Sequence, residues 1–381
     1  MRVLVLTRLF PSAQNPSLGM FIHRRTAALA EVCDVAVVAL STADGLPERE
    51  HMDALDVIRP RWRRLPKVGV LVDGRSYAAT AARAVERFHL EFDLIDSHWL
   101  YPDGYAAARL GRRLGKPVVV TGRGTDVNEL CFRWPFRRLA RRALREATRL
   151  VAVSRPLKDR MVEAGADAER ISVVHNGIDA DTFHPATDRA DVRRRLGIPD
   201  GQVALLSAGA LGEAKGFHDL VASMAGVRGG RTAHLYVAGE GAYRAALEQC
   251  VAEYGAGENV TLLGGVPQAD LVAWYQAADL FCFGSWREGC PNVVLEALAC
   301  GLPVLSTPVG AVPDLVEEGR DGLLFEAHSP TAFAHALERA LAADWDRAAI
   351  ARRGAQRSWD HVAREYLAVF EQALDDWRAK P

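Results

Sequence analysis

The sequence predicts an α/β protein built from two doubly wound domains, and three observations support this fold class. Short apolar, β-branched segments alternate with helical segments along the chain. This alternation occurs once in each half of the sequence. The length of 381 residues is more than one hydrophobic core usually serves and suits two domains. Such alternation is typical of parallel sheets covered by helices on both faces.

In the first half, apolar segments predict strands at 2–7, 35–40, 94–98, 117–122, 149–154 and 172–177. Helices are expected at 19–31, 103–115 and 156–164, with an arginine-rich helix after the strand at 117–122. In the second half, strands are expected at 203–209, 233–239, 260–264, 280–285, 303–308 and 322–325. Polar residues and prolines gather at 178–200, where we expect the linker. The predicted domains are 1–185 and 186–360, and their ligands are expected in a deep cleft between them.

Charge and composition exclude several classes of protein. The net charge is −1, but residues 1–185 carry 29 basic and 22 acidic residues, so the second half is acidic. No nucleic-acid-binding module is visible, and we expect no nucleic-acid partner. No apolar run has the length of a membrane span, and the N-terminus is typical of a first strand, so we expect a cytoplasmic protein. The six cysteines show no metal-ligand spacing, so no metal site is expected.

The stretch SWREGCPNVVLEALACG, residues 285–301, holds two carboxylates in an unusual setting. Glu288 lies in a loop after the strand at 280–285, and Glu296 lies in an apolar helix predicted from Asn292 to Ala299, ended by Gly301. The N-terminus of this helix is suited to a phosphate. Carboxylates accept hydrogen bonds from paired hydroxyls, so this arrangement suits a nucleoside diphosphate sugar. The alternative is a capping glutamate followed by a surface glutamate.

Several motifs resemble glycosyltransferase family 4, whose members are retaining enzymes with the GT-B fold. EGCPNVVLEALACGLPVLSTP is similar to the family signature, GALGEAKGFHDL (209–220) resembles its phosphate-binding segment, and HNGID (175–179) resembles its interdomain segment. The final stretch resembles the closing helix, expected at 360–381, that crosses back onto the first domain. LTRLFPSAQNPSLGMF and SHWLYPDG are most similar to members that build cell-surface polysaccharides, including teichuronic acid-type enzymes.

The resemblance implies roles for individual residues. Lys215 would offset charge on the leaving diphosphate, Glu288 would bind the transferred sugar, and Glu296 would bind the ribose. Backbone groups of Gly265 and Val266 would contact the base. The implied donor site comprises Gly209, Lys215, Gly265, Val266, Glu288, Gly289, Cys290, Pro291, Asn292, Val293 and Glu296. The donor is a co-substrate, with UDP-sugars favoured over GDP-sugars, and the resemblance implies neither a cofactor nor a metal.

The sequence departs from the family pattern at two positions. Ala210 stands where many members carry an arginine, and Arg123 stands where many carry a histidine. Arg123 is therefore expected to supply the lost charge or to position the acceptor; the alternative is a structural arginine paired with Asp126. Strand-end positions also make Gly19, His98 and Asp126 candidates for contacting the acceptor, which is expected to be a glycan or a lipid-linked glycan. The predicted catalytic residues are Lys215, Glu288, His98 and Arg123.

The segment 131–150 carries seven arginines together with Phe132, Trp134, Phe136 and Leu139. This pattern is typical of segments that bind an anionic membrane surface, and it favours a peripheral location on the inner face of the cell membrane. RPRWRRLPK, residues 59–67, forms a second basic patch with a tryptophan. The alternative is a solvated helix face whose arginine stems cover core residues.

Three other functions stay open beside polysaccharide synthesis. The first is transfer to a small-molecule acceptor in specialised metabolism, which uses the same donor motifs. The second is a GT-B sugar-nucleotide epimerase, and the third is a non-catalytic protein that binds a sugar nucleotide. The sequence argues against a nicotinamide dehydrogenase, which would need a GxGxxG turn after the first strand, because LTRLFPSAQ contains none.

Overall fold

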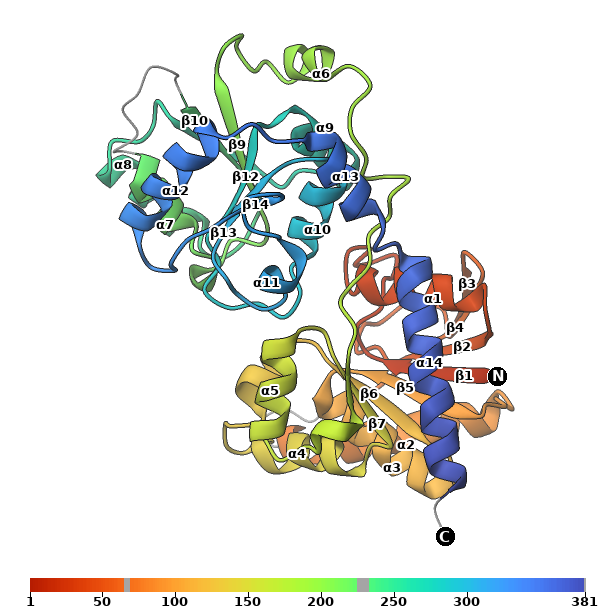
Figure 1. The fold of residues 1–381 in the computed structure, drawn as a ribbon. Coiled ribbons are helices and arrows are strands. Elements are labelled where there is room, and N and C mark those ends of the chain that lie inside the picture. The colour runs from red at the N-terminus through yellow and green to blue at the C-terminus, as the bar shows by residue number, and fades with distance from the viewer. Residues whose placement is uncertain (65–68, 225–232, 380–381) are drawn as a thin grey trace. The chain divides into compact units, whose positions relative to one another are not determined.

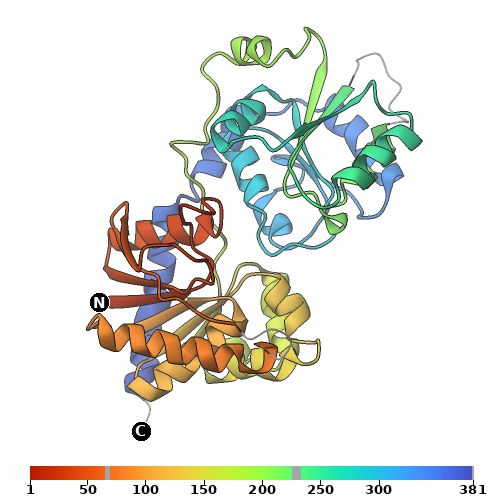
Figure 2. The ribbon, with the colours of Figure 1, turned by 180° about the vertical axis from the view of Figure 1, so that it is seen from behind.

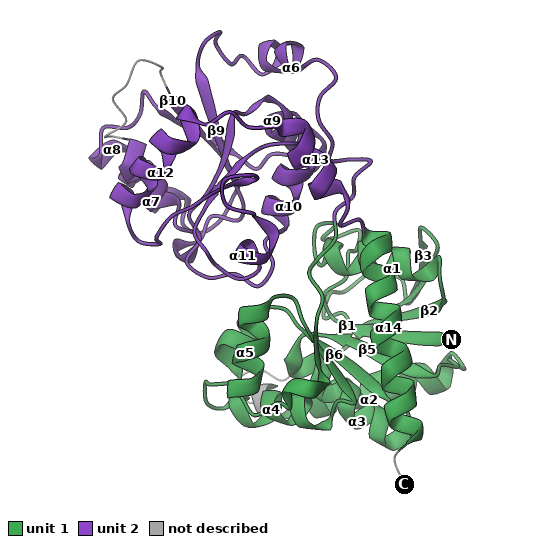
Figure 3. Ribbon diagram, in the orientation of Figure 1, with its two compact units in different colours: residues 1–177, 359–381 green, residues 178–358 purple. Residues whose placement is uncertain are grey.

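A computed structural model of the protein describes residues 1–64, 69–224 and 233–379 (Figure 1). The chain forms two compact units, one of Met1–Gly177 with Trp359–Pro381 and one of Ile178–Ser358 (Figure 3). The boundaries expected from the sequence were 185/186 and 360. The segment after Gly177 belongs to the second unit because Ile178 and Phe183 are buried in that unit's core.

The sheet of the first unit has eight strands in the order β3-β4-β2-β1-β5-β6-β7-β8. Neighbouring strands run parallel, except that β3 pairs antiparallel with β4 at the edge. Apolar side chains of β1, β5, β6 and β7 are buried, as expected for a sheet covered on both faces. The strands are β1 Arg2–Thr7, β2 Asp34–Ala39, β3 Arg49–Met52, β4 Leu55–Ile58, β5 Leu94–His98, β6 Val118–Gly122, β7 Arg149–Ala152 and β8 Ile171–Val173.

Six α-helices belong to the described part of this unit, and the last comes from the C-terminus of the chain. Helix α14 packs against α1 and against β6 and β7 (Figures 1 and 2). Its Val362, Tyr366 and Phe370 are almost completely buried, and each contributes about 1.5–3 kcal/mol through burial. The helices are α1 Met20–Ala30, α2 Gly69–Arg87, α3 Tyr105–Leu114, α4 Phe136–Glu146, α5 Arg155–Glu163 and α14 Trp359–Arg378, with single turns at η1 Leu100–Gly104, η2 Asp126–Leu130 and η3 Ala168–Arg170.

The sheet of the second unit has six parallel strands in the order β11-β10-β9-β12-β13-β14. They are β9 Val203–Ala208, β10 Ala233–Ala238, β11 Val260–Gly264, β12 Leu280–Phe283, β13 Val304–Ser306 and β14 Gly322–Leu324. The helices are α6 Arg189–Arg195, α7 Phe217–Met224, α8 Arg244–Glu253, α9 Gln268–Ala277, α10 Asn292–Ala299, α11 Val312–Leu315, α12 Pro330–Ala342 and α13 Arg347–Ala355, with a turn at η4 Glu213–Lys215.

The strand order of each sheet reverses direction once. In the second unit the chain proceeds from β9 outward to β11 and then returns to place β12 on the other side of β9. In the first unit the equivalent reversal lies between β1 and β5. The loops that leave such neighbouring strands diverge, and ligands of open α/β sheets bind in the space between them. The reversal therefore marks the carboxyl ends of β9 and β12 as the place to look for a site in the second unit.

Candidate active site

Lys215 and Glu288, both predicted to be catalytic, lie together at this reversal point. Lys215 ends the turn η4 after β9, and Glu288 lies in the loop after β12. The Nζ of Lys215 is 2.6 Å from Oε1 of Glu288, and the Oγ of Ser285 donates a hydrogen bond of 3.0 Å to the same oxygen. Both charged side chains are largely shielded, with exposures of 34% for Lys215 and 14% for Glu288. This partly buried ion pair fixes the positions of both charged groups at the edge of the sheet.

Two glycines allow the loops that carry this pair to pack closely. Gly216 has a φ of +63°, and a Cβ placed on it would lie 2.0 Å from the carbonyl oxygen of Gly284. Beside this contact the backbone N–H of Trp286 donates to the carbonyl of Ala214 at 2.9 Å. The indole Nε1 of Trp286 donates to Asp219 at 2.7 Å. The two loops therefore form one rigid support for Lys215 and Glu288.

The loop after β13 holds the Glu288 segment from its other side. The backbone N–H of Ala311 donates to the carbonyl of Gly289 at 2.9 Å. Gly310 has a φ of +55°, and a Cβ placed there would lie 2.5 Å from the same carbonyl oxygen. The position of Glu288 thus depends on a glycine 22 residues further along the chain, and no motif in the sequence marks this dependence.

Glu296 lies one turn into α10, as the sequence predicted. Val294, Leu295, Ala297 and Leu298 are buried around it, while Glu296 itself is half-buried. Its Oε2 accepts a hydrogen bond of 2.9 Å from the phenol of Tyr275, on α9. Burial, and secondarily the adjacent carboxylate, raises the pKa of Tyr275 well above its ordinary value, so the phenol remains a donor at neutral pH. Tyr275 was missed because a tyrosine in an apolar helix is typical of the core.

The other predicted donor-site residues lie in loops at the same edge of the sheet or in the first turn of α10. Gly209 directly follows β9, and its N–H donates to Ala238 at 3.0 Å. Gly265 follows β11, and its N–H donates to Glu240 at 3.0 Å, so in this structure that amide has a protein partner. Val266, Cys290 and Val293 pack against the core of the unit. Pro291 is the N-cap of α10, which begins at Asn292, and Gly301 follows the helix with a φ of +71°.

In the first unit, His98, Arg123 and Asp126 form a buried network with partners that the sequence did not reveal. The guanidinium of Arg123 donates to Nδ1 of His98 and to Oδ1 of Asn176, each at 2.8 Å. Asp126 instead accepts backbone N–H groups of Arg123, Gly124 and Leu100. The expected structural alternative, in which the Arg123 side chain pairs with Asp126, is therefore replaced by pairing with His98 and Asn176.

His98 is fully buried, and its protonation state follows from its neighbours. Burial, and next the charge of Arg25, lowers the pKa of His98 to about 3, so the ring is neutral. Arginine can only donate, so Nδ1 is the acceptor and the proton lies on Nε2, which is 3.3 Å from Asp96. Burial opposes ionisation of Asp96, but Arg25 and His98 outweigh it and lower its pKa. A contact between His98 and an acceptor stays a prediction that would require the ring to become accessible.

Gly19 occupies the left-handed region, with a φ of +70°, at the N-cap of α1. A Cβ placed there would lie 2.3 Å from the carbonyl oxygen of Leu9. The absence of a side chain at Gly19 thus allows the start of α1 to pack closely against the loop after β1. Contact with a ligand at Gly19 stays a prediction.

The basic segment 131–150 divides into a structural and an exposed set of arginines. Arg141, Arg142 and Arg149 bind Cys131, Glu146 and Asp376, respectively. Trp134 is 73% exposed and is flanked by exposed Arg133, Arg137 and Arg138. In the second basic patch, by contrast, Trp62 is only 4% exposed, so the prediction of a tryptophan available to a membrane is wrong there. Residues 65–67 of that patch lie outside the described residues.

The described residues contain neither a candidate metal site nor a candidate membrane span. Residues 1–64, 69–224 and 233–379 contain no group of three or more histidine, cysteine, aspartate or glutamate side chains arranged to hold a metal ion. No helix in the same part of the chain combines the length and the hydropathy that a membrane span requires.

Comparison with known proteins connects both units to glycosyltransferases. Residues 18–182 match the family described as Glycosyltransferase Family 4, and residues 188–357 match Glycosyl transferases group 1. The chain is 32% identical to D-inositol 3-phosphate glycosyltransferase of Arthrobacter sp. (strain FB24), over 96% of this chain and 93% of that protein. It is 29% identical to the teichuronic acid biosynthesis glycosyltransferase TuaC of Bacillus subtilis, over 89% of each chain.

Solved structures share the fold. Sucrose-phosphate synthase from Thermosynechococcus elongatus matches with a TM-score of 0.80 and 22% identity, over 97% of this chain and 98% of that one. Anabaena HepE, solved in complex with UDP, matches with a TM-score of 0.77 and 21% identity, over 98% and 100%. Both neighbours are GT-B proteins. With two parallel-sheet units, matching family models and relatives along nearly its whole length, the chain belongs to glycosyltransferase family 4 and is a glycosyltransferase of the GT-B fold.

Proposed function

We propose that the protein transfers a sugar, with retention of the anomeric configuration, from a nucleoside diphosphate sugar to an acceptor in the synthesis of a cell-surface polysaccharide. The observation that carries the donor assignment is the Lys215–Glu288 pair at the β9/β12 reversal, with Glu296 nearby in sequence on α10. A UDP-sugar is favoured. HepE, a protein of the same fold, has been solved with UDP and with UDP-glucose.

The chemistry of each side chain suits one part of such a donor. In the proposed complex the ammonium of Lys215 faces the diphosphate and offsets the charge that develops as the glycosyl bond breaks. Glu288 then accepts hydrogen bonds from sugar hydroxyls, while Ser285 keeps one of its oxygens in place. Glu296, held by Tyr275, accepts from the ribose hydroxyls. The start of α10 provides the positive end of a helix dipole for the diphosphate.

The acceptor is proposed to be a glycan or lipid-linked glycan bound by the first unit. The similarity to TuaC, named for teichuronic acid biosynthesis, supports this choice. A small-molecule acceptor is the second candidate, since another relative is named for D-inositol 3-phosphate. Arg123 is proposed to position the acceptor, because its guanidinium donates to two neutral side chains, those of His98 and Asn176.

Turnover of nucleotide sugars tests the donor assignment. The protein is incubated with UDP-, GDP-, ADP- and dTDP-sugars, with and without acceptor, and release of the nucleotide is measured. We expect Lys215→Ala to lose roughly 100-fold to 1,000-fold in turnover, as removal of one transition-state donor does in other enzymes. Lys116→Ala, which removes a half-buried lysine of the first unit, serves as the matched control. Formation of an epimer without acceptor would instead identify an epimerase, and no turnover of any donor would identify a binding protein.

Peripheral binding to an anionic membrane is a separate part of the proposal. Trp134 projects an aromatic ring beside three exposed arginines, none of which has an ion-pair partner among the described residues. Anionic lipids attract such residues, and an indole inserts readily at the headgroup level. Wild type should sediment with vesicles of phosphatidylglycerol but not phosphatidylcholine. Trp134→Ser should weaken this binding, while Tyr254→Ser, at a tyrosine that is 51% exposed in the other unit, should leave it unchanged. Equal binding by all three proteins would refute the assignment.

A further inference from the structure

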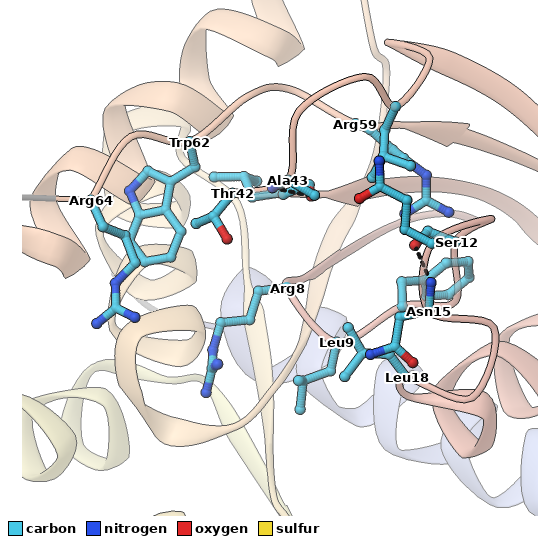
Figure 4. Close-up of a pocket in the computed structure, with 15 residues that line it drawn as sticks. Arg8, Leu9, Ser12, Asn15, Leu18, Thr42, Ala43, Arg59, Trp62 and Arg64 are labelled. Atoms are coloured by element: carbon cyan, nitrogen blue, oxygen red, sulfur yellow. Dashed lines mark hydrogen bonds between the residues drawn. The ribbon is translucent and has the colours of Figure 1, made fainter.

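A cavity of about 360 Å³ opens within the first unit, at the carboxyl ends of β1, β2 and β4. Its volume lies within the range of small-molecule sites, roughly 300–1,000 Å³. The lining that matters here comprises Arg8, Ser12, Asn15, Thr42, Trp62 and Arg64. Figure 4 shows Arg8, Thr42, Trp62 and Arg64 on one side of the pocket and Ser12 and Asn15 on the other. The proposed catalytic residues of the first unit, His98 and Arg123, do not line this cavity.

Among the described residues, the lining contains three arginines and no aspartate or glutamate. Arg59 is only 2% exposed and is committed to the fold, because its guanidinium binds Glu50 and the carbonyl of Pro11. The side chains of Arg8 and Arg64 are 33% and 57% exposed. Arg8 and Arg64 are therefore the two cations in the described part of the lining that a ligand in the cavity can reach.

Each of these two arginines is oriented by a buried carboxylate, and each has donor groups that bind no acceptor among the described residues. Nε of Arg8 donates to Asp103 at 3.1 Å, and no described residue accepts from either of its Nη groups. Nε and one Nη of Arg64 donate to a single oxygen of Asp73, and its guanidinium lies 5.6 Å from the ring centre of Trp62. Asp103 and Asp73 are 0% and 3% exposed, so they fix the arginines from behind. The two guanidinium groups are thus oriented in advance and come from separate loops, an arrangement that suits a multivalent anion.

We propose that this cavity binds a phosphate group of the acceptor, with Arg8 and Arg64 gripping the phosphate. A phosphate offers three acceptor oxygens and so can bind both guanidinium groups, whereas one guanidinium group already satisfies the two oxygens of a carboxylate. The hydroxyls of Ser12 and Thr42 and the amide of Asn15 face the remaining space and suit the hydroxyls of a polyol or sugar. The acceptor class is thus a phosphorylated polyol or a diphosphate-linked sugar. This inference rests on the proposed function, since it assigns the acceptor of that transfer.

Direct binding to the full chain tests the inference without any turnover. Calorimetric titrations use myo-inositol 1-phosphate against myo-inositol, and farnesyl diphosphate against farnesol. Phosphate-bearing probes should bind at least tenfold more tightly than their parent alcohols. Tighter binding of farnesyl diphosphate would assign a lipid-linked source, and tighter binding of the polyol phosphate a free one. Glucuronate, a polyol carboxylate, should bind more weakly than the polyol phosphate.

Arg64→Gln and Arg61→Gln form a matched pair of variants. Arg61 is 56% exposed and also pairs with one aspartate, Asp44, but it does not line the cavity. Arg64→Gln should weaken phosphate binding roughly tenfold to a hundredfold, the loss of a charge-assisted hydrogen bond, while Arg61→Gln should match wild type. Arg8→Lys, which keeps the charge but loses the fork, should also weaken it. Equal affinity in Arg64→Gln and Arg61→Gln, or equal binding of inositol and its phosphate, would overturn the inference.

Titration of the same samples with UDP separates this inference from the proposed function. UDP bound by the second unit without phosphate binding in the cavity would sink only the acceptor assignment. If the protein bound the polyol phosphate but no nucleotide, the acceptor assignment of the cavity would be supported and the donor assignment would be refuted. Since UDP also carries phosphates, its affinity should be unchanged in Arg64→Gln and reduced in Lys215→Ala.

Discussion

Replacing Tyr275 with phenylalanine removes one oxygen and leaves the ring in place. The phenol of Tyr275 is fully buried and donates to Oε2 of Glu296 at 2.9 Å. A hydrogen bond to a charged group contributes about 1.5–3 kcal/mol, and the half-buried position of Glu296 places the loss near the lower end. Phenylalanine fills the same volume, so no cavity term adds to this loss. We expect the variant to be less stable by about 1–2 kcal/mol, a fall of about 2–6 °C in Tm.

The effect on the ligand separates a positioning role from a structural one. If Tyr275 aims Glu296 at the ribose, Tyr275→Phe should weaken UDP roughly threefold to tenfold, the loss of part of one hydrogen bond. The same variant should bind 2′,3′-dideoxy-UDP as wild type does, because that ligand offers Glu296 no hydroxyl. The assay is calorimetric titration of both proteins with both nucleotides. A variant that loses stability but keeps the wild-type preference for UDP over the dideoxy compound would refute the positioning role.

Two further predictions follow from the geometry. Gly310→Ala should lower kcat/KM roughly tenfold to a hundredfold, because the added Cβ would displace the Glu288 loop. The control is Gly319→Ala, at a φ of +82° with open space around it, which should lose only about 1 kcal/mol of stability and keep its turnover. Equal turnover in the two variants would contradict this prediction. His98 has a pKa of about 3 when folded and about 6.5 when unfolded, so the unfolded chain binds the extra proton between these values and wild type loses stability as pH falls. His98→Gln keeps an acceptor for Arg123 but cannot titrate. Between pH 6 and 4, denaturant unfolding should therefore show that the free energy of unfolding falls more steeply in wild type than in the variant, by about 1.4 kcal/mol per pH unit. Parallel pH profiles of the two proteins would contradict a neutral buried His98.

Much of the fold could be predicted because buried parallel strands produce continuous apolar runs. The strands at 2–7, 203–209 and 233–239 are visible for this reason. The β3–β4 hairpin was missed because REHM and LDVI are short and carry charged residues, which is typical of an edge. Helix α2 was missed because glycine and aspartate interrupt its first turns.

Residues of the candidate site could be predicted at strand ends and within the α10 motif, but the contacts that support them could not. Lys215 and Glu288 could be placed together because β9 and β12 were both visible as strands. Their support from Ser285, Gly216 and Gly310 depends on how three loops pack, which periodicity does not encode. Tyr275 and Glu296 are 21 residues apart on different helices, so only the packing of α9 against α10 reveals their contact. The second basic patch was interpreted as a membrane surface, yet Trp62 is buried beneath Arg64.

A crystal structure of the protein soaked with a UDP-sugar tests the donor site most directly. It should show the diphosphate beside Nζ of Lys215 and the first residues of α10, with Glu296 on the ribose and Glu288 on the sugar. A donor bound elsewhere, with the Lys215–Glu288 pair intact and Glu296 out of contact with the donor, would contradict the account.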